Sequence, residues 1–299
     1  IAKLNPVIAA TTSFVCSTVA VVARIWMTGF NTVEINRGDA NLEHFVEAVS
    51  NRASGQPLIT LANHSSVIDD PVLMAAMLPW ESLMQPRNFR FAACSQEVCF
   101  RSDIAAAFMA CGQVLPIKRG AGIDHPFLLD LCRHAAAGRW VHLFPEGKVN
   151  QTGKLGSDGW GVRSVAESER VGGKLKWGVG KMIAHAPVTP MVIAFSASGL
   201  AEMLPCDEPM GKMSPIKLRN IHGKLVRIRV GGALRFDDLI EAHVKLHGPL
   251  WKYGARPTDE SGDWRTQWPS SPSERVLYGA ITRRVEEALL ELESHVMSA

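Results

Sequence analysis

Short apolar runs alternate along the chain with stretches whose apolar positions recur every three to four residues. The short runs are rich in β-branched residues, which is typical of buried strands, and the longer period is typical of helices. Strands are expected at residues 57–61, 89–93, 114–117, 140–144, 188–195 and 225–230. Helices are expected at residues 71–77, 104–111, 126–137, 178–185 and 273–296. This alternation predicts an α/β fold, in which helices cover a sheet.

The first apolar run has a different character. Residues 4–23 contain no charge and lie between Lys3 and Arg24. A helix of this length spans about 30 Å, which barely matches the hydrocarbon thickness of a bilayer. Pro6 and five Ser/Thr residues weaken a full span, so we expect an interfacial or re-entrant membrane helix within residues 1–29. The alternative is a core helix packed on the rest of the chain.

The remaining residues, 30–299, are expected to form one domain, because neither an internal repeat nor a clean linker is evident. Two polar stretches, 151–175 and 252–273, are rich in residues that favour loops and are interpreted as insertions. The net charge of +3 is too small to indicate nucleic-acid binding. No nucleic-acid partner is therefore expected.

Six cysteines are spread along the chain without a C-x-x-C pair or the spacing of a zinc site. In a chain of this length we interpret them as small buried apolar residues rather than as disulfides. They are Cys16, Cys94, Cys99, Cys111, Cys132 and Cys206. No metal site is expected from them.

The stretch "LITLANHSSVIDDP" (58–71) contains the first candidate for catalysis. A strand ending at residue 61 would place His64 at the carboxyl edge of a sheet, where α/β proteins usually bind ligands. If the following turn folds back, the Asp69 carboxylate can bind one nitrogen of the His64 ring and leave the other as a general base. The alternative is an aspartate that caps the next helix beside an unrelated histidine.

Further polar groups follow later strands. "GQVLPIKRG" (112–120) carries Arg119, "WVHLFPEGKVN" (140–150) carries Glu146 and Gly147, and "APVTPMVI" (186–193) carries two prolines. Together with the His-Asp stretch, this series resembles the four sequence blocks of the glycerolipid acyltransferases. The stretch "KWGVGKMIA" (176–184) is similar to one branch of that family. The likeness runs from about residue 57 to residue 235 and implies a mixed, mainly parallel sheet flanked by helices.

That branch implies an activity and roles for individual residues. The implied reaction is CoA-independent transfer of a fatty acyl chain from a phospholipid to a lysophospholipid such as monolysocardiolipin, with His64 as the general base oriented by Asp69. Arg119 would hold a phosphate, and Glu146 would bind glycerol hydroxyls or orient the head of the lysolipid. Gly147 would let the backbone approach the ligand closely.

Three positions near the histidine have less certain roles. Asn63 and Ser66 are assigned to substrate binding, although Ser66 can instead form hydrogen bonds within the turn. Asp70 is expected to cap the helix, or to hold the catalytic residues in place without contacting the substrate. Like the roles above, these assignments depend on the resemblance.

The residues argue against two other kinds of site, a serine hydrolase and a phosphate-binding loop. A serine hydrolase needs a G-x-S-x-G stretch, which the chain lacks. The stretch from Gly178 to Lys181 looks like a phosphate-binding loop, but that loop requires Gly at position 175 and Ser or Thr at position 182. The chain has Leu175 and Met182 there.

Three functions remain open: the transacylase, an acyl-CoA-dependent lysophospholipid acyltransferase, and an inert membrane scaffold that binds lipid. The expected partners are phospholipid and lysophospholipid substrates and a membrane surface, which the chain would contact from one side. Homo-oligomerisation is left open, and no cofactor is expected. The resemblance implies a mitochondrial membrane location facing the intermembrane space.

Overall fold

The computed structural model describes residues 6–36, 39–151, 175–207, 212–213, 220–253 and 269–297. The stretches expected as insertions, 151–175 and 252–273, lie mostly outside these ranges. Their status as insertions therefore stays a prediction.

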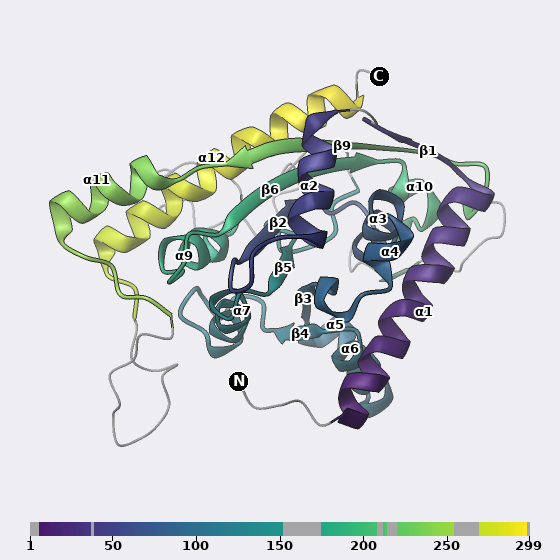
Figure 1. Ribbon diagram of the computed structural model, residues 1–299, viewed down its shortest axis with the longest axis horizontal. Helices are drawn as coiled ribbons and strands as arrows, with labels where there is room; N and C mark the ends of the chain where they lie inside the picture. Colours follow the sequence, from purple (N-terminus) through teal and green to yellow (C-terminus); the bar gives the residue numbers. More distant parts are fainter. Residues whose placement is uncertain are drawn as a thin grey trace.

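Seven strands form the central sheet in the order β1-β9-β6-β2-β5-β3-β4 (Figure 1). The strands β2 to β6 run parallel to one another, β9 runs antiparallel to β6, and β1 runs parallel to β9. The expected mixed, mainly parallel sheet is therefore confirmed. Its strands are β1 (Thr32–Ile35), β2 (Leu58–Ala62), β3 (Phe91–Ser95), β4 (Val114–Ile117), β5 (Trp140–Leu143), β6 (Met191–Ser198) and β9 (Leu225–Leu234).

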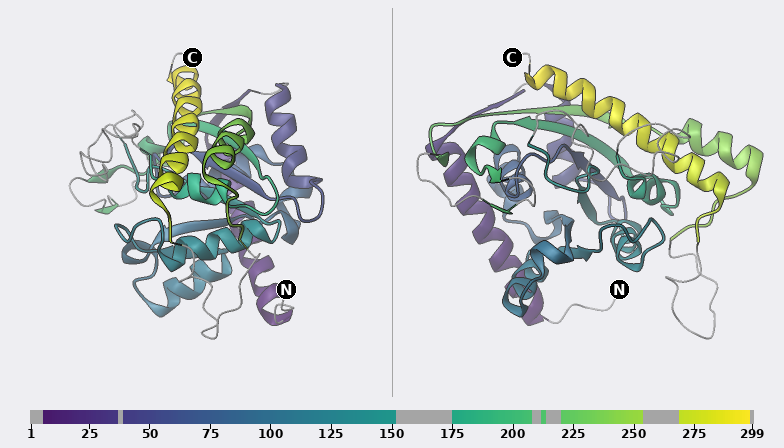
Figure 2. Two further views of the ribbon diagram at one scale, coloured as in Figure 1. Left: turned by 90° about the vertical axis from the view of Figure 1, so that its left-hand side faces the viewer. Right: turned by 180° about the vertical axis from the view of Figure 1, so that it is seen from behind.

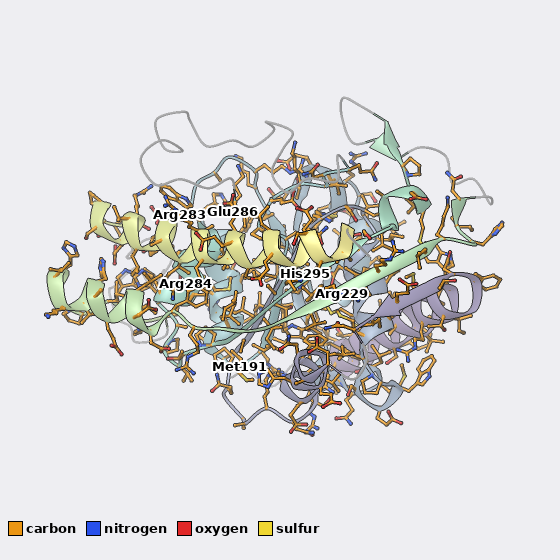
Figure 3. The ribbon with its side chains drawn as sticks, turned by 90° about the horizontal axis from the view of Figure 1, so that it is seen from above. Met191, Arg229, Arg283, Arg284, Glu286 and His295 are labelled. Atoms are coloured by element: carbon orange, nitrogen blue, oxygen red, sulfur yellow. A yellow bond between two sulfur atoms is a disulfide. The ribbon has the colours of Figure 1, made fainter. Side chains whose placement is uncertain are left out.

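Helices cover both faces of the sheet (Figures 1 and 2). One face packs against α1 (Pro6–Phe30), α2 (Ala40–Ser50) and α3 (Asp69–Met77). The other face packs against α7 (Pro126–Ala136), α9 (Gly178–Ala184) and α12 (Pro272–Met297). In the view from above, α12 lies along β9 with α11 (Asp237–His247) beside it (Figure 3). Each face has its own buried apolar cluster, so the sheet separates two cores.

Short elements connect these layers. They are α4 (Trp80–Leu83), η1 (Pro86–Asn88), α5 (Gln96–Cys99), α6 (Asp103–Cys111), α10 (Leu200–Met203) and a separate two-stranded sheet of β7 (Cys206–Asp207) and β8 (Lys212–Met213).

Local chemistry sets the start of the long C-terminal helix. Ser271 Oγ accepts a hydrogen bond from the Glu274 backbone N–H at 3.2 Å, and the Glu274 carboxylate accepts one from the Ser271 N–H at 2.7 Å. This reciprocal arrangement is a capping box, which satisfies two N–H groups that have no partner within the helix. Pro272 follows at the first helical position, where its missing N–H costs nothing.

The N-terminal helix α1 is longer than the uncharged run that predicted it. Pro6 stands at its first position and does not interrupt it, and the helix continues past Arg24 to Phe30. Arg24 turns toward the domain and donates hydrogen bonds to the carbonyls of Ala75 and Leu78, at 2.5 and 2.6 Å. By length and composition α1 could cross a membrane, and its length of about 38 Å exceeds our expectation.

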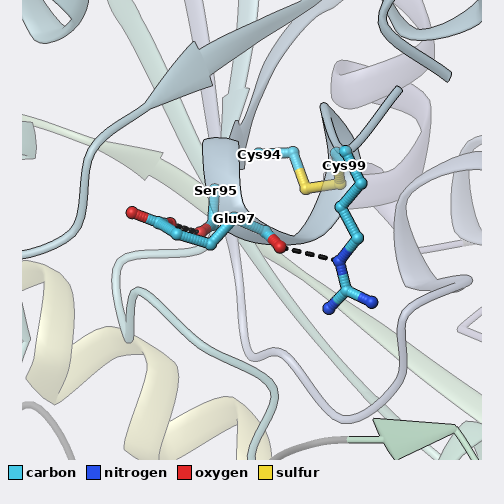
Figure 4. Close-up of a disulfide and its surroundings, with 5 residues drawn as sticks. Cys94, Ser95, Glu97 and Cys99 are labelled. Atoms are coloured by element: carbon cyan, nitrogen blue, oxygen red, sulfur yellow. Dashed lines mark hydrogen bonds between the residues drawn. A yellow bond between two sulfur atoms is a disulfide. The ribbon is translucent and has the colours of Figure 1, made fainter. Parts of the chain in front are cut away.

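The interpretation of all six cysteines as unpaired is wrong for two of them. Cys94 and Cys99 form a disulfide (Figure 4). β3 ends at Ser95 and α5 begins at the next residue, so the chain turns back and brings the two Cα atoms to 6.0 Å, within the range that a disulfide spans. Cys16, Cys111 and Cys132 are free thiols.

Candidate active site

The loop after β2 carries His64 to the carboxyl edge of the sheet, as expected. Its ring is partly buried and joins the lining of an apolar cavity. The His64 Nδ1 atom lies 3.0 Å from Asp69 Oδ2. No bond from a residue in the described ranges reaches the other ring nitrogen, Nε2. The predicted fold-back of Asp69 onto His64 is therefore present.

Asp69 holds more than the imidazole. Its Oδ2 atom also accepts hydrogen bonds from the backbone N–H groups of Ser65 and Ser66, at 2.6 and 2.8 Å. Three donors thus converge on one oxygen of a side chain that is 1% exposed. Because the carboxylate can only accept, this contact favours the tautomer with its proton on Nδ1 and leaves Nε2 as a base.

Phe144, just beyond β5, fixes the plane of the same ring. The Phe144 and His64 rings are stacked with centroids 4.0 Å apart and an interplanar angle of 14°. The Asp69 contact sets the rotation of the imidazole, and the stack restricts its tilt. Phe144 had no expected role, although it lies within the stretch WVHLFPEGKVN.

Glu146 links two of the sequence blocks. Its Oε1 accepts the His64 backbone N–H at 2.8 Å, and its Oε2 accepts the Asn150 side-chain amide at 2.9 Å. The Asn150 N–H in turn donates to the His64 carbonyl at 2.6 Å. Glu146 therefore braces the histidine loop in this structure, and its contact with glycerol hydroxyls stays a prediction.

Gly147 forms the turn that aims Glu146 inward. Its φ of +76° lies in the left-handed region, and its N–H donates to the Phe144 carbonyl at 3.0 Å. A Cβ here would approach the Lys176 side chain to 3.3 Å. The backbone conformation thus favours glycine, while close approach to a ligand stays a prediction.

Asn63 and Ser66 flank the histidine without facing the cavity. The Asn63 amide exchanges two hydrogen bonds with the Ala197 backbone, both at 2.9 Å, and so ties the end of β2 to β6. Ser66 is fully buried, and its hydroxyl has no hydrogen-bond partner among the described residues. Their assignment to substrate binding stays a prediction.

Asp70 points to a different partner from its neighbour. Its carboxylate binds the Arg90 guanidinium through two parallel hydrogen bonds, at 2.7 and 2.5 Å. Arg90 also donates to the Gly112 carbonyl at 3.0 Å. Burial raises the pKa of Asp70, but the charge of Arg90 and its hydrogen bonds outweigh burial and hold this pKa below its usual value. Nothing in the sequence singled out Arg90.

An apolar cavity of about 250 Å³ lies beside these groups. His64, Asp70, Arg90 and Phe144 contribute to its lining, and its remaining wall is mainly apolar. Part of that wall comes from α1, through Val15, Cys16, Val19 and Ala20. Other parts come from α3 and α6, and the Cys94–Cys99 disulfide also borders the space. The His64 imidazole thus lies beside an apolar space, which suits a long hydrocarbon chain.

Arg119 does not join this cavity. It lies in the loop of residues 118–125 between β4 and α7, and its side chain is exposed. Because β4 runs parallel to β2, this loop lies at the same edge of the sheet as His64, three strands away. The structure therefore does not bring Arg119 into contact with the His64 group, and its phosphate-binding role stays a prediction.

His142 is a buried titratable group behind the site. Its Nδ1 lies 2.9 Å from Thr60 Oγ1, which also accepts a hydrogen bond from the Trp140 indole at 2.8 Å. Its ring packs edge-on against Phe144, with centroids 4.6 Å apart. Burial lowers the pKa of His142 to about 4, so the ring is neutral at pH 7.

Comparison with known proteins identifies the family. Residues 38–194 match the protein family described as Acyltransferase, which is more than half of the 299 residues. The chain belongs to this acyltransferase family. The resemblance inferred from the sequence blocks is thereby confirmed, and all the catalytic candidates from His64 to Gly147 fall within the matched range.

Individual acyltransferases show the same relationship. The chain is 34% identical to N-acylphosphatidylethanolamine synthase of Arabidopsis thaliana over 66% of its own length, and 29% identical to tafazzin of Drosophila melanogaster over 76%. It is also 25% identical to tafazzin of Saccharomyces cerevisiae, over 92% of this chain and 74% of that protein. The chain spans only 62% of the Arabidopsis protein and 52% of the Drosophila one.

Proposed function

We propose that this acyltransferase-family protein is a CoA-independent phospholipid–lysophospholipid transacylase that remodels lipids such as cardiolipin. The observation that supports it best is the position of His64, held by Asp69 beside an apolar cavity. The resemblance to tafazzins over most of the chain supports the same reaction. A lipid-binding scaffold would need the cavity but no oriented base.

The reaction follows from these groups. His64 Nε2 takes the proton of the lysolipid hydroxyl while that oxygen attacks the ester carbonyl carbon of the donor phospholipid. The donor C–O ester bond then breaks, and the imidazolium returns the proton to the departing glycerol oxygen. One ester is exchanged for another, so no activated donor is required. Asp69 stabilises the imidazolium while it exists.

Substrate contacts are assigned on the same basis. The apolar cavity would take the acyl chain, and Arg119 would bind a phosphate of the lysolipid from the neighbouring loop. Glu146 and Gly147 would contribute to the glycerol side, with Asn63 and Ser66 shaping the loop between them. To test these contacts, the apparent KM is measured for a lysolipid that carries a phosphate and for one that lacks it.

The transacylase proposal is tested by identifying which molecule donates the acyl chain. Purified full-length protein is incubated with a phospholipid that carries a labelled acyl chain and an unlabelled lysolipid, with and without acyl-CoA. The expected result is label in the acceptor without acyl-CoA. Transfer that occurs only with acyl-CoA would replace this proposal by the CoA-dependent acyltransferase. A lack of transfer under both conditions, with bound lipid, would favour the scaffold.

A second candidate is favoured by the relative from Arabidopsis. Its name denotes synthesis of N-acylphosphatidylethanolamine, so its acceptor is an amine rather than a hydroxyl. The same His64 base could take a proton from that amine. Phosphatidylethanolamine replaces the lysolipid in the assay, and the product is treated with mild alkali. An amide survives this treatment, whereas an ester is cleaved.

Membrane contact is proposed for the face formed by α1 and α6, with the chain lying on one leaflet. On α1, Phe14 is 72% exposed, and on the neighbouring α6, Ile104 is 85% exposed. Exposed apolar side chains on adjacent helices suit an interfacial position. By resemblance, we place the protein on a mitochondrial membrane facing the intermembrane space.

Vesicle sedimentation tests this surface. The Phe14→Asp and Ile104→Asp variants should leave more protein in the supernatant than the wild type. Leu246→Asp is the matched control, because Leu246 is 76% exposed but lies on α11. Equal binding by all three variants would contradict the proposed face.

A further inference from the structure

The Gly-Val-Gly-Lys stretch that resembles a phosphate-binding loop has another use in this fold. Lys181 lies within α9, and its side chain is completely buried. Its ammonium reaches Asp124 in the loop of residues 118–125. A buried lysine is costly unless its charge is paired and its donors are satisfied. Its partners therefore indicate what it does.

The partners of Lys181 converge on Asp124. The Lys181 ammonium forms an ion pair with Asp124 and donates to Ser270 Oγ at 3.0 Å. Ser270 donates to the same carboxylate through its hydroxyl and its backbone N–H. Arg275 binds the second carboxylate oxygen at 2.9 Å. Burial raises the pKa of Asp124, but the hydrogen bonds from Lys181 and Ser270 and the nearby cations outweigh burial and lower this pKa.

This cluster joins three segments that lie far apart in the sequence. Asp124 is in the loop between β4 and α7, Lys181 is on α9, and Ser270 and Arg275 lie at the start of α12. Between Arg119 and Asp124, the Ala121 N–H donates to the Lys118 carbonyl at 3.4 Å, and Ile123 packs against the apolar core. Gly120 and Gly122 have φ values of +75° and +84°, and neither would meet a neighbour with an added Cβ. The loop is thus bent by its glycines and held by two neighbours, Ile123 in the core and Asp124 in this cluster.

We propose that Lys181 and Asp124 are positioning residues, which hold the 118–125 loop so that Arg119 faces the phosphate of the lysolipid. This inference rests on the proposed function of the same site. Neither residue touches the substrate. Their contribution is to reduce the conformational freedom that Arg119 would otherwise lose on binding.

A purely structural role is the competing explanation. The same cluster could only fasten the start of α12 to α9, in which case its loss would lower stability without changing how substrates are recognised. The two explanations differ in the acceptor whose binding changes. Positioning of Arg119 affects an acceptor that carries a phosphate, and it leaves a monoacylglycerol, which has no phosphate, unaffected.

The test measures apparent KM and kcat in the transacylase assay for Arg119→Ala, Lys181→Met and Arg119→Ala/Lys181→Met. A hydrogen bond to a charged group contributes about 1.5–3 kcal/mol, so loss of Arg119 should raise KM for the lysophospholipid about 10-fold or more. Lys181→Met should raise the same KM by a similar factor, with kcat changed less than about twofold. The double variant should be no worse than Arg119→Ala alone, because the two residues act through one contact.

Two variants control for folding. Lys181→Arg keeps the cation and should restore a KM near that of the wild type. Asp238→Asn breaks a different ion pair, between Asp238 on α11 and Arg284 on α12, whose two contacts are 2.6 and 2.7 Å. Figure 3 labels Arg284 on α12. The Asp238→Asn variant should leave KM unchanged. If Lys181→Met does not fold, Ser270→Ala removes one partner of Asp124 and should raise KM in the same direction.

Several results would overturn the inference. Additive effects in the double variant would show that Lys181 does not act through Arg119. An equal rise in KM for monoacylglycerol, or a change confined to kcat, would favour the structural explanation. Failure of the wild type to transfer acyl chains would instead refute the proposed function. A rise in KM with Arg119→Ala but not with Lys181→Met would refute this inference alone.

Discussion

Asp69 and Asp70 are adjacent in the first turn of α3, but they serve two different neighbourhoods. Asp69 binds the His64 ring and two backbone N–H groups, and the second ring nitrogen stays available to the cavity. Asp70 binds Arg90, whose third hydrogen bond goes to the Gly112 carbonyl. The helical rotation of about 100° between successive residues directs the two carboxylates to different partners.

The difference shows what makes one carboxylate–cation pair suited to chemistry. Arg90 is always charged, so its pairing with Asp70 fixes geometry without exchanging protons. A neutral imidazole has a lone pair on the ring nitrogen that carries no proton, so the Asp69 contact at Nδ1 leaves His64 Nε2 able to accept one. We therefore expect the Asp69 side to control activity and the Asp70 side to control stability.

The largest effect is expected for His64→Ala. Without the imidazole, the lysolipid hydroxyl has no base beside it, and transfer should fall by about 10³-fold or more. The variant should still fold, because the ring is not part of either apolar core. Single-turnover rates and circular dichroism measure the two quantities. A variant with a tenth of the normal rate would end the assignment of His64 as the base.

Asp69→Asn should reduce transfer almost as much, by about 10³-fold, because an amide can hold the ring in the wrong tautomer. Its stability should change by only about 1–2 kcal/mol, since the amide oxygen still accepts from the backbone. Rates and urea unfolding of the same preparation separate the two effects. Equal losses of rate in Asp69→Asn and Asp70→Asn would remove the contrast between the neighbours.

Asp70→Asn should act mainly on stability. It leaves the partly buried Arg90 guanidinium without its carboxylate, which costs about 3 kcal/mol in the free energy of unfolding. The rate per folded molecule should change less than about tenfold. Urea unfolding measures the change in the free energy of unfolding. Rates normalised to the concentration of active sites measure the change in activity per folded molecule.

A double variant controls this prediction. Arg90→Met with Asp70→Leu removes both charges and keeps apolar volume, so it should be more stable than Asp70→Asn alone. If the double variant were the less stable of the two, the cost could not come from an unpaired cation.

A smaller effect is expected from His142. Burial lowers the pKa of its ring to about 4, and the opposing charge of Asp70 offsets only part of this shift. The unfolded chain takes up this proton near pH 6.5, whereas the folded protein takes it up only near pH 4. Its stabilising contribution is therefore complete above pH 6.5 and is lost as the pH falls through 4, by about 3 kcal/mol.

His142→Gln should flatten this acid-side slope, as measured by urea unfolding at pH 7, 6 and 5. His44→Gln is the matched control, since His44 is exposed and its replacement should leave the slope unchanged. An unaltered slope in His142→Gln would mean that His142 does not titrate as described.

Periodic segments with strong signals were predictable. The strand at 114–117 has the expected bounds, and α6, α7 and α12 lie within one residue of theirs. β6 was expected from residue 188 but begins at Met191, because the preceding prolines donate no N–H. β1 was not predicted, because a four-residue edge strand has weak periodicity. α2 was also not predicted, although Leu42, Phe45, Val46 and Val49 recur at the spacing of a helix face.

The candidate site was predictable where neighbours in sequence meet, and less so where they do not. His64 and Asp69 are five residues apart, and one turn brings them together. Arg90 lies 20 residues from Asp70, and the pair depends on where the fold places the start of β3. The Cys94–Cys99 disulfide was not predicted for a related reason. It depends on the short helix α5, and four residues are too few to show a helical period.

Part of the space beside His64 is closed by α1, through Val15, Cys16, Val19 and Ala20. A truncated form that begins after Phe30, made to ease purification, would therefore be missing one side of its own reaction chamber. Such a form should be slow even toward short-chain substrates dissolved in water, where attachment to a bilayer no longer matters.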